Sequence, residues 1–219
     1  MLYIALPSRG LIFSRTLQCV IEGMQALNAI GIATKYVYTH DLPIPDSHNA
    51  CIDKALQDPA CQKIFIVEED MYIDPQAFVA LATSEHNIAV LQYNDRNGSP
   101  HGILHYNEEH EIIWTGLGAA VIKREVFEAI GSPYFKTHPR YGIKKKMGPN
   151  GIYISEFYEL EGSEPYAYGG LDINFYTRAR EKGYKIVCLP EYKAHQFELV
   201  QLSDQINRSN NGCHIIKQV

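Results

Sequence analysis

The stretch IFIVEEDMYIDP (residues 64–75) joins a short apolar run to three consecutive acids. The residues from Ile64 to Val67 are β-branched or aromatic, which favours a buried strand. A buried strand does not usually end in three carboxylates. In an open parallel sheet, ligands bind beyond the carboxyl ends of the strands. The acids therefore mark a candidate ligand site.

The spacing of the three acids suggests what they bind. Alternate residues of an extended segment point to the same side, so we expect Glu68 and Asp70 to converge and Glu69 to point away. Two neighbouring carboxylates suit Mg²⁺ or Mn²⁺, which would bridge them to a diphosphate. The alternative is that the acids cap the next turn in solvent. Asp74 and Pro75 have a separate role, as N-cap and first residue of the following helix.

The chain around this strand alternates strands and helices. Apolar residues at three- and four-residue spacing predict a helix that Gly31 ends, and Asp46 or Ser47 is expected to cap a short second helix. The β-α-β-α-β-α-β order predicts an α/β fold with a mostly parallel sheet flanked by helices. The expected strands are 2–6, 34–40, 64–67 and 87–93, and the second helix is 48–57.

The regular alternation of strands and helices ends after residue 95. Short strands are expected on either side of TGLG (115–118), and glycine, proline and lysine predict a long mobile loop over 132–151. We expect one catalytic domain over 1–202, with halves 1–95 and 96–202, and a polar tail over 203–219. The remaining expected elements are strands 111–114, 119–122 and 184–190, helices 123–131 and 169–183, and the segment 191–196 after the last strand.

Composition narrows the class of protein. A net charge of -5 and a pI of about 6.0 give no general affinity for a polyanion. The five cysteines are scattered without a CxxC pair, which argues against a disulfide framework or a zinc finger. No apolar run approaches the ~18 residues of a membrane helix. We expect a cytoplasmic protein with reduced thiols, no signal peptide and no membrane span.

Three features follow one another in a fixed order. The acidic triplet comes first, then WTGLGAAVIKREVFEAIG (114–131), then YGGLDINFYTRAREKGYKIVCLPEYKAHQ (168–196). This order, over residues 2–196, resembles the GT-A-fold glycosyltransferases, especially compact inverting enzymes of the family 2 type. The resemblance implies a Rossmann-like mixed sheet with a smaller acceptor-side region. It also implies metal-dependent transfer of a sugar from a nucleotide-sugar donor, expected to be a UDP-sugar.

The resemblance also assigns donor contacts. In PSRG (7–10), Pro7, Ser8 and Arg9 would contact the nucleotide, while Glu69 would lie near the ribose or sugar. The alternatives are a plain strand-to-helix turn and, for Arg9, a surface ion pair.

The implied cofactor is Mn²⁺ or Mg²⁺. The acidic triplet matches the family's DxD motif, so Asp70 would be the direct metal ligand and Glu68 would face the ion or the ribose. His195 matches the histidine that often completes the metal site. The alternatives are that His195 is an ordinary surface histidine, or that His214 from the tail takes the place of His195 at the metal.

Asp172 matches the acid that serves as catalytic base in the family. An inverting transfer needs a carboxylate to take the proton of the attacking hydroxyl. Leu171 stands where the family commonly has a glutamate, which departs from the pattern. The alternative interpretation of Asp172 is a helix N-cap or first-turn acid, and one residue can have both roles.

Further contacts are implied around the substrates. The stretch with Gly116 would form a floor under donor sugar and acceptor, and Trp114 would stack on a sugar or belong to the core. Asp95 and Arg96 would reach the donor or lie in a solvated loop. The basic residues of 132–151 would close over the diphosphate, meet an anionic acceptor, or be solvated; they are Lys136, Arg140 and Lys144 to Lys146.

Two other functions remain open. A nucleotidyltransferase acting on sugar phosphates also uses a metal and a Rossmann-like sheet, although PSRG is a reduced form of its usual phosphate loop. A non-catalytic nucleotide-sugar-binding module is the second. The acceptor is equally open between a saccharide, a small molecule, a protein and modified phage DNA.

Overall fold

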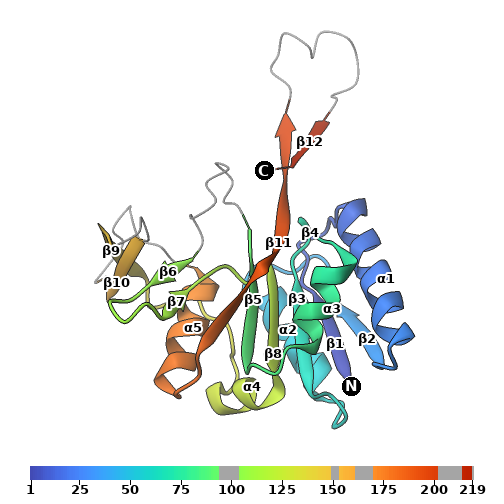
Figure 1. The fold of residues 1–219 in the computed structure, drawn as a ribbon, viewed down its shortest axis with the longest axis horizontal. Coiled ribbons are helices and arrows are strands. Elements are labelled where there is room, and N and C mark those ends of the chain that lie inside the picture. Colours follow the sequence, from blue (N-terminus) through green and yellow to red (C-terminus); the bar gives the residue numbers. More distant parts are fainter. Residues whose placement is uncertain (94–103, 149–152, 161–169, 202–213, 219) are drawn as a thin grey trace.

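The computed structural model describes residues 1–93, 104–148, 153–160, 170–201 and 214–218. A mixed sheet runs through the molecule in the order β2-β1-β3-β8-β5-β11-β7-β6-β10-β9, with β4 and β12 paired to β11 (Figure 1). The helices are α1 (Ser14–Ala29), α2 (Asp46–Leu56), α3 (Pro75–Thr83), α4 (Arg124–Ile130) and α5 (Leu171–Glu181). The strands are β1 (Leu2–Leu6), β2 (Thr34–Tyr38), β3 (Lys63–Val67), β4 (Met71–Ile73), β5 (Ile88–Gln92), β6 (His105–Tyr106), β7 (Ile112–Trp114), β8 (Ala119–Lys123), β9 (Tyr141–Met147), β10 (Tyr153–Glu159), β11 (Ile186–Gln201) and β12 (His214–Gln218).

The expected fold class is confirmed, and the strand expected over 119–122, β8, lies inside the central sheet. β1 pairs in parallel with β2 and β3, and β5 pairs in parallel with β11. β8 lies between β3 and β5 and runs antiparallel to both. The register of Val67 with Ala119 brings TGLG beside the acidic triplet, where the Glu68 amide donates to the Gly118 carbonyl at 3.2 Å. β8 therefore carries the second sequence feature to the end of β3.

The apolar run of β3 is buried because helices cover both faces of the sheet. Ile64 and Ile66 belong to a core formed with α2, α4 and α5. Phe65 and Val67 face the opposite core, formed with α1 and α3. In Figure 1, α1 and α3 lie together on one side of the sheet. With apolar cover on both faces, β3 is a rigid support for the acids that follow it.

The local signals at helix ends agree with the structure except at α2. Asp74 caps α3, since its carboxylate accepts from the amides of Gln76 and Ala77, both at 3.0 Å. α1 ends before Gly31, whose φ of 82° is readily adopted by glycine. The expected side-chain cap of α2 was wrong. Asp46 is already helical, and the Ser47 hydroxyl is buried, 3.4 Å from His48 Nδ1.

The long loop expected over 132–151 was also wrong in part. Residues Tyr141–Met147 form β9, which pairs antiparallel with β10. The basic cluster therefore belongs to a strand that is hydrogen-bonded to β10; its residues are Lys144, Lys145 and Lys146. Gly142 permits the pairing, because a Cβ there would lie 2.3 Å from the Tyr158 ring. Residues 149–151, the end of the predicted loop, lie outside the described residues.

The strand expected over 184–190 is longer than the sequence pattern indicated. β11 extends from Ile186 to Gln201, through the segment 191–196, with a register shift against β5 between Cys188 and Lys193. Along its length it pairs with β5, β7, β4 and β12. Beyond the body of the molecule, β11 and β12 form a two-stranded extension (Figure 1), in which His214 pairs with Gln201. Within the described ranges, none of the helices has both the length and the apolar character needed to cross a membrane.

Candidate active site

The three acids after β3 lie on a tight turn rather than an extended segment. The Met71 amide donates to the Glu68 carbonyl at 3.2 Å, which reverses the chain before β4. The expectation that Glu69 points away was therefore wrong, because side-chain alternation ends where the strand ends. All three acids line one pocket of about 90 Å³, together with Pro7, Arg9, Ile44, Ser47, His48 and Gln196.

Glu69 is held by the loop that follows β1. Its carboxylate accepts from the Ser8 hydroxyl and the Arg9 amide, each at 2.9 Å, and from the Arg9 guanidinium at 2.7 and 2.9 Å. Burial alone would raise the pKa of the Glu69 carboxyl, but the hydrogen bonds from Arg9 and Ser8 outweigh it and lower the pKa. Glu69 is a fixed anion that shapes the PSRG loop.

The PSRG loop divides into a supporting and an exposed part. Ser8 is buried and its hydroxyl also accepts from the Gly10 amide at 3.0 Å. Pro7 and Arg9 line the pocket, and the Arg9 side chain is 59% exposed. The structure therefore places Pro7 and Arg9 where a ligand can meet them and Ser8 behind them.

Asp70 is held by β11. Gln196 donates its side-chain amide to the Asp70 carboxylate at 3.0 Å, and the Phe197 amide donates to the Asp70 carbonyl at 2.7 Å. Sequence reasoning missed Gln196 and chose its neighbour His195. Which of the two faces the turn depends on the register of β11 against β4, which the sequence does not reveal.

His195 lies on the other side of β11. It pairs with Tyr72, and the two rings are 6.3 Å apart between centroids. Residue alternation places Gln196 toward the pocket and His195 away from it. Among the residues that the structure describes, no three His, Cys, Asp or Glu side chains come together to hold a metal. The expected set of Glu68, Asp70 and His195 is therefore not assembled.

The donor set that remains fits a hard divalent cation. Asp70 supplies carboxylate oxygens and Gln196 an amide group, and both side chains line the pocket. Mg²⁺ and Mn²⁺ accept oxygen ligands, and Mg²⁺ is commonly held by one or two carboxylates and substrate phosphates. An imidazole is not required in such a site.

Glu68 faces a histidine that the sequence did not suggest. His48 Nε2 lies 3.3 Å from Glu68 Oε1, and the His48 side chain is only 3% exposed. His48 packs edge-on against Phe135, with centroids 5.4 Å apart. A histidine near the start of a short helix has no spacing that links it to a distant carboxylate, so only the structure shows the pair.

Asp172 lies in the first turn of α5, partly buried. Its Oδ1 accepts from the Ile173 amide at 3.1 Å, and the side chain folds back over Gly170. Burial and, to a lesser extent, the nearby charge of Glu68 raise the pKa of the Asp172 carboxyl to about 7, against the hydrogen bond from the Ile173 amide. A carboxyl that titrates near neutrality is suited to accept a proton.

The glycine-containing stretch before β8 is buried. Residues 115–120 have little solvent exposure, and the Gly116 carbonyl accepts from the Tyr176 hydroxyl at 3.4 Å. A Cβ on Gly118 would lie 2.9 Å from Met71 Sδ, so small residues serve close internal packing here. Gly116 does not line the acidic pocket. Asp95 and Arg96 lie outside the described residues.

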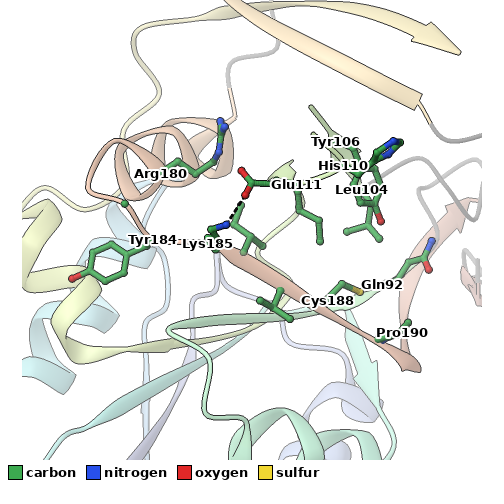
Figure 2. Close-up of a pocket in the computed structure, with 14 residues that line it drawn as sticks. Gln92, Leu104, Tyr106, His110, Glu111, Arg180, Tyr184, Lys185, Cys188 and Pro190 are labelled. Atoms are coloured by element: carbon green, nitrogen blue, oxygen red, sulfur yellow. Dashed lines mark hydrogen bonds and ion pairs between the residues drawn. The ribbon is translucent and has the colours of Figure 1, made fainter. Parts of the chain in front are cut away.

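A larger cavity of about 620 Å³ lies elsewhere, beside the first half of β11 (Figure 2). Its carboxylate, Glu111, is paired with Lys185 at 2.6 Å, and burial raises the pKa of the Cys188 thiol to about 11. The cavity contains none of the site residues suggested by the sequence. The acidic pocket is smaller, but it is lined by five of them, Pro7, Arg9, Glu68, Glu69 and Asp70, and is the candidate active site.

The sequence matches no protein-family model, and no curated protein matches it closely. Its fold is similar to that of A197 from STIV, at 17% identity over 90% of this chain and 85% of that chain, with a TM-score of 0.54.

Two further solved structures are more distant. A β-1,4-galactosyltransferase 7 from Drosophila, solved with manganese, UDP-Gal and xylobiose, is 14% identical over 97% of this chain and 75% of that chain, with a TM-score of 0.47. An inositol-1-phosphate CTP transferase from T. maritima is 12% identical over 97% and 98%, with a TM-score of 0.48. At these identities the likeness concerns the fold alone.

Proposed function

We propose that this chain is a metal-dependent glycosyltransferase. It transfers a sugar from a nucleoside-diphosphate sugar, expected to be a UDP-sugar, to an acceptor hydroxyl with inversion. One observation carries the proposal: Asp172, a partly buried carboxylate with a pKa of about 7, lies within electrostatic reach of Glu68, and Glu68 lines the acidic pocket. A carboxylate raised by burial and a like charge is typical of a general base.

The proposed reaction uses Asp172 as that base. Its carboxylate takes the proton of the acceptor hydroxyl while the hydroxyl oxygen bonds to the anomeric carbon. The bond between that carbon and the diphosphate oxygen breaks, and the nucleoside diphosphate leaves with the electron pair. Attack opposite the departing group inverts the anomeric configuration. The first turn of α5 holds the base in place through the Ile173 amide.

Asp70 and Gln196 are the residues proposed to hold the cation. A bound Mg²⁺ or Mn²⁺ would supply positive charge against the leaving diphosphate. The guanidinium of Arg9 also brings positive charge to this pocket, and Glu69 orients it through two hydrogen bonds. The Asp70 side chain and backbone are both fixed by β11, so the ligand is positioned before the donor arrives.

The runner-up is a nucleotidyltransferase. Its phosphate loop would need free backbone amides after β1, whereas the Arg9 amide donates to Glu69 and the Gly10 amide to Ser8. These bonds favour the glycosyltransferase. A module that binds nucleotide sugars without reacting is the third candidate.

Product analysis separates the three functions. The protein is incubated with a panel of nucleotide sugars and either Mn²⁺ or Mg²⁺, with and without saccharide acceptors. We expect release of nucleoside diphosphate that stops when EDTA is added. Pyrophosphate release from a nucleoside triphosphate and a sugar phosphate would establish the nucleotidyltransferase instead. Tight donor binding without any turnover would establish the binding module. Activity that survives EDTA would refute the role of Asp70 as metal ligand.

A further inference from the structure

His48 is a buried histidine that the proposed mechanism does not use. It belongs to α2, its side chain is only 3% exposed, and it lines the acidic pocket together with Glu68 and Asp70. Its Nε2 atom lies 3.3 Å from Glu68 Oε1. An ionised carboxylate only accepts hydrogen bonds, so Nε2 carries the hydrogen and donates it to Glu68.

The orientation of the His48 ring is fixed by its neighbours. The ring packs edge-on against Phe135, with centroids 5.4 Å apart. The backbone of Phe135 is bound to α2 in turn, because the Asn49 side chain donates to its carbonyl and accepts from its amide, both at 3.0 Å. The hydroxyl of Ser47 lies 3.4 Å from Nδ1, the nitrogen that can accept while Nε2 donates. These contacts hold Nε2 toward Glu68.

The three acids of the turn differ in the groups that hold them. Glu69 is tied to the loop after β1, and Glu68 is bound to the imidazole of His48. Asp70 accepts from the neutral side-chain amide of Gln196. A cation binds a carboxylate through the same oxygen lone pairs that accept hydrogen bonds. A carboxylate turned toward a fixed imidazole is therefore directed away from the cation.

We propose that His48 is a positioning residue, which holds the Glu68 carboxylate toward α2 and keeps it out of the ligand set of the cation. Asp70 is then the carboxylate that binds the cation. The contact depends only on the fold, and its consequence rests on the cation site of the proposed function. A second carboxylate ligand would strengthen cation binding, because affinity rises with the number of charged ligands. His48 therefore limits the affinity of the pocket for the cation.

Two substitutions that differ by one methylene group test the proposal. Glutamine at position 48 places its amide nitrogen near the position of Nε2, whereas asparagine places it near Nδ1, too short to reach Glu68. The affinity for Mn²⁺ alone is measured from the free-ion signal in electron paramagnetic resonance. We expect His48→Asn to bind Mn²⁺ about tenfold more tightly than His48→Gln, because only asparagine releases Glu68. Equal affinities in the two variants, or no binding in either, would overturn the proposal.

The gain in affinity must come from Glu68. We expect it to disappear when Glu68→Gln is added to His48→Asn, and a gain that persists would refute the proposal. His40→Asn is the matched control, because His40 Nδ1 lies 3.0 Å from a carboxylate oxygen of Asp41 in an exposed pair that does not line the pocket. Its Mn²⁺ affinity should equal that of the wild type. A merely structural role of His48 would weaken binding in both His48 variants and strengthen it in neither.

Two further comparisons keep the outcomes distinct. If His48→Asn does not fold, Glu68→Gln in the wild-type background decides. It should cost less Mn²⁺ affinity than Asp70→Asn, since Asp70 is the ligand, and equal losses would overturn the proposal. If the wild-type protein turns over no nucleotide sugar, the proposed function fails. The Mn²⁺ affinities still decide whether His48 keeps Glu68 away from the cation.

Discussion

Glu69, which lines the acidic pocket, and Asp172, which lies within electrostatic reach of Glu68, have opposite pKa shifts. On the β1 side, Glu69 receives hydrogen bonds from Ser8 and Arg9, and its pKa is lowered. On the α5 side, burial and Glu68 raise the pKa of Asp172 to about 7. The difference teaches that a carboxylate that accepts many hydrogen bonds keeps its charge and fixes a loop. A buried carboxylate that accepts few hydrogen bonds can bind a proton near neutral pH.

The largest effect is expected from Asp172→Asn, which removes the proton acceptor and nearly preserves its shape. We expect the transfer rate at saturating substrates to fall about 10²–10⁴-fold, as for loss of a general base. Glu125→Gln serves as control, because it removes an acid from the same position of another helix. Product formation is measured by chromatography. A rate within threefold of the wild type would mean that Asp172 is not the base.

Gly170→Ala tests whether the carboxylate must fold back as it does. A Cβ at Gly170 would lie 2.0 Å from Asp172 Oδ1, so the side chain would have to rotate away. We expect kcat to fall about 10- to 100-fold with little change in stability, since φ of -81° and ψ of 139° suit alanine.

Gly31→Ala is the control for that experiment, because we expect the opposite result: a loss of stability with an unchanged kcat. Gly31 has a φ of 82° and open space around it, so alanine should lower stability by about 1 kcal/mol and leave kcat intact. Stability is followed by urea unfolding and kcat by product release. Equal kcat values in the two variants would show that Gly170 has no role in placing Asp172.

Glu69→Gln tests the hydrogen bonds between the acidic turn and the loop after β1. Losing the charge leaves the donors of Ser8 and Arg9 poorly matched, and we expect the free energy of unfolding to fall by roughly 1–3 kcal/mol. Donor KM should rise more than kcat falls. Combined with Arg9→Gln in a double-mutant cycle, the effects should be less than additive. If the effects of the two substitutions were simply additive, Glu69 would not hold the loop through Arg9.

The smallest effect concerns stability against pH. The pKa of Asp172 rises from 3.8 to about 7 on folding, so the folded state binds more protons between these values. This group therefore lowers the stability of the wild-type protein as pH increases through that range. Asp172→Asn should leave Tm unchanged near pH 4 and raise it by about a few degrees at pH 8. Glu125→Gln should show no such pH-dependent gain, and a gain at pH 4 would contradict the raised pKa.

The sequence predicted features that depend on neighbouring residues. The run Ile64 to Val67, the cap at Asp74 and the order of strands and helices over residues 2–93, apart from β4, need only local patterns and helix or strand periodicity. The position of Asp172 in the first turn of a helix is local in the same sense. These features were confirmed because short-range propensity and burial agree in them.

The missed features depend on contacts between distant segments. The turn from Glu68 to Met71 breaks the alternation assumed for an extended strand. His48 and Gln196 reach the acids from other elements, through packing and register that no local pattern encodes. The position of β8 between β3 and β5 is likewise set by the order of strands in the sheet, which no local pattern encodes. Strand pairing over such separations is decided by the whole sheet.

The hold of β11 on Asp70 has a consequence for how the protein matures. The partners of Asp70 lie at positions 196 and 197, and the Gln196 contact spans 126 residues of sequence. A chain growing from its amino terminus can form β1, β2 and β3 early, but Asp70 gains these partners only after residues 196 and 197 have been synthesised. The proposed cation site would therefore be completed well after the strand that leads into it.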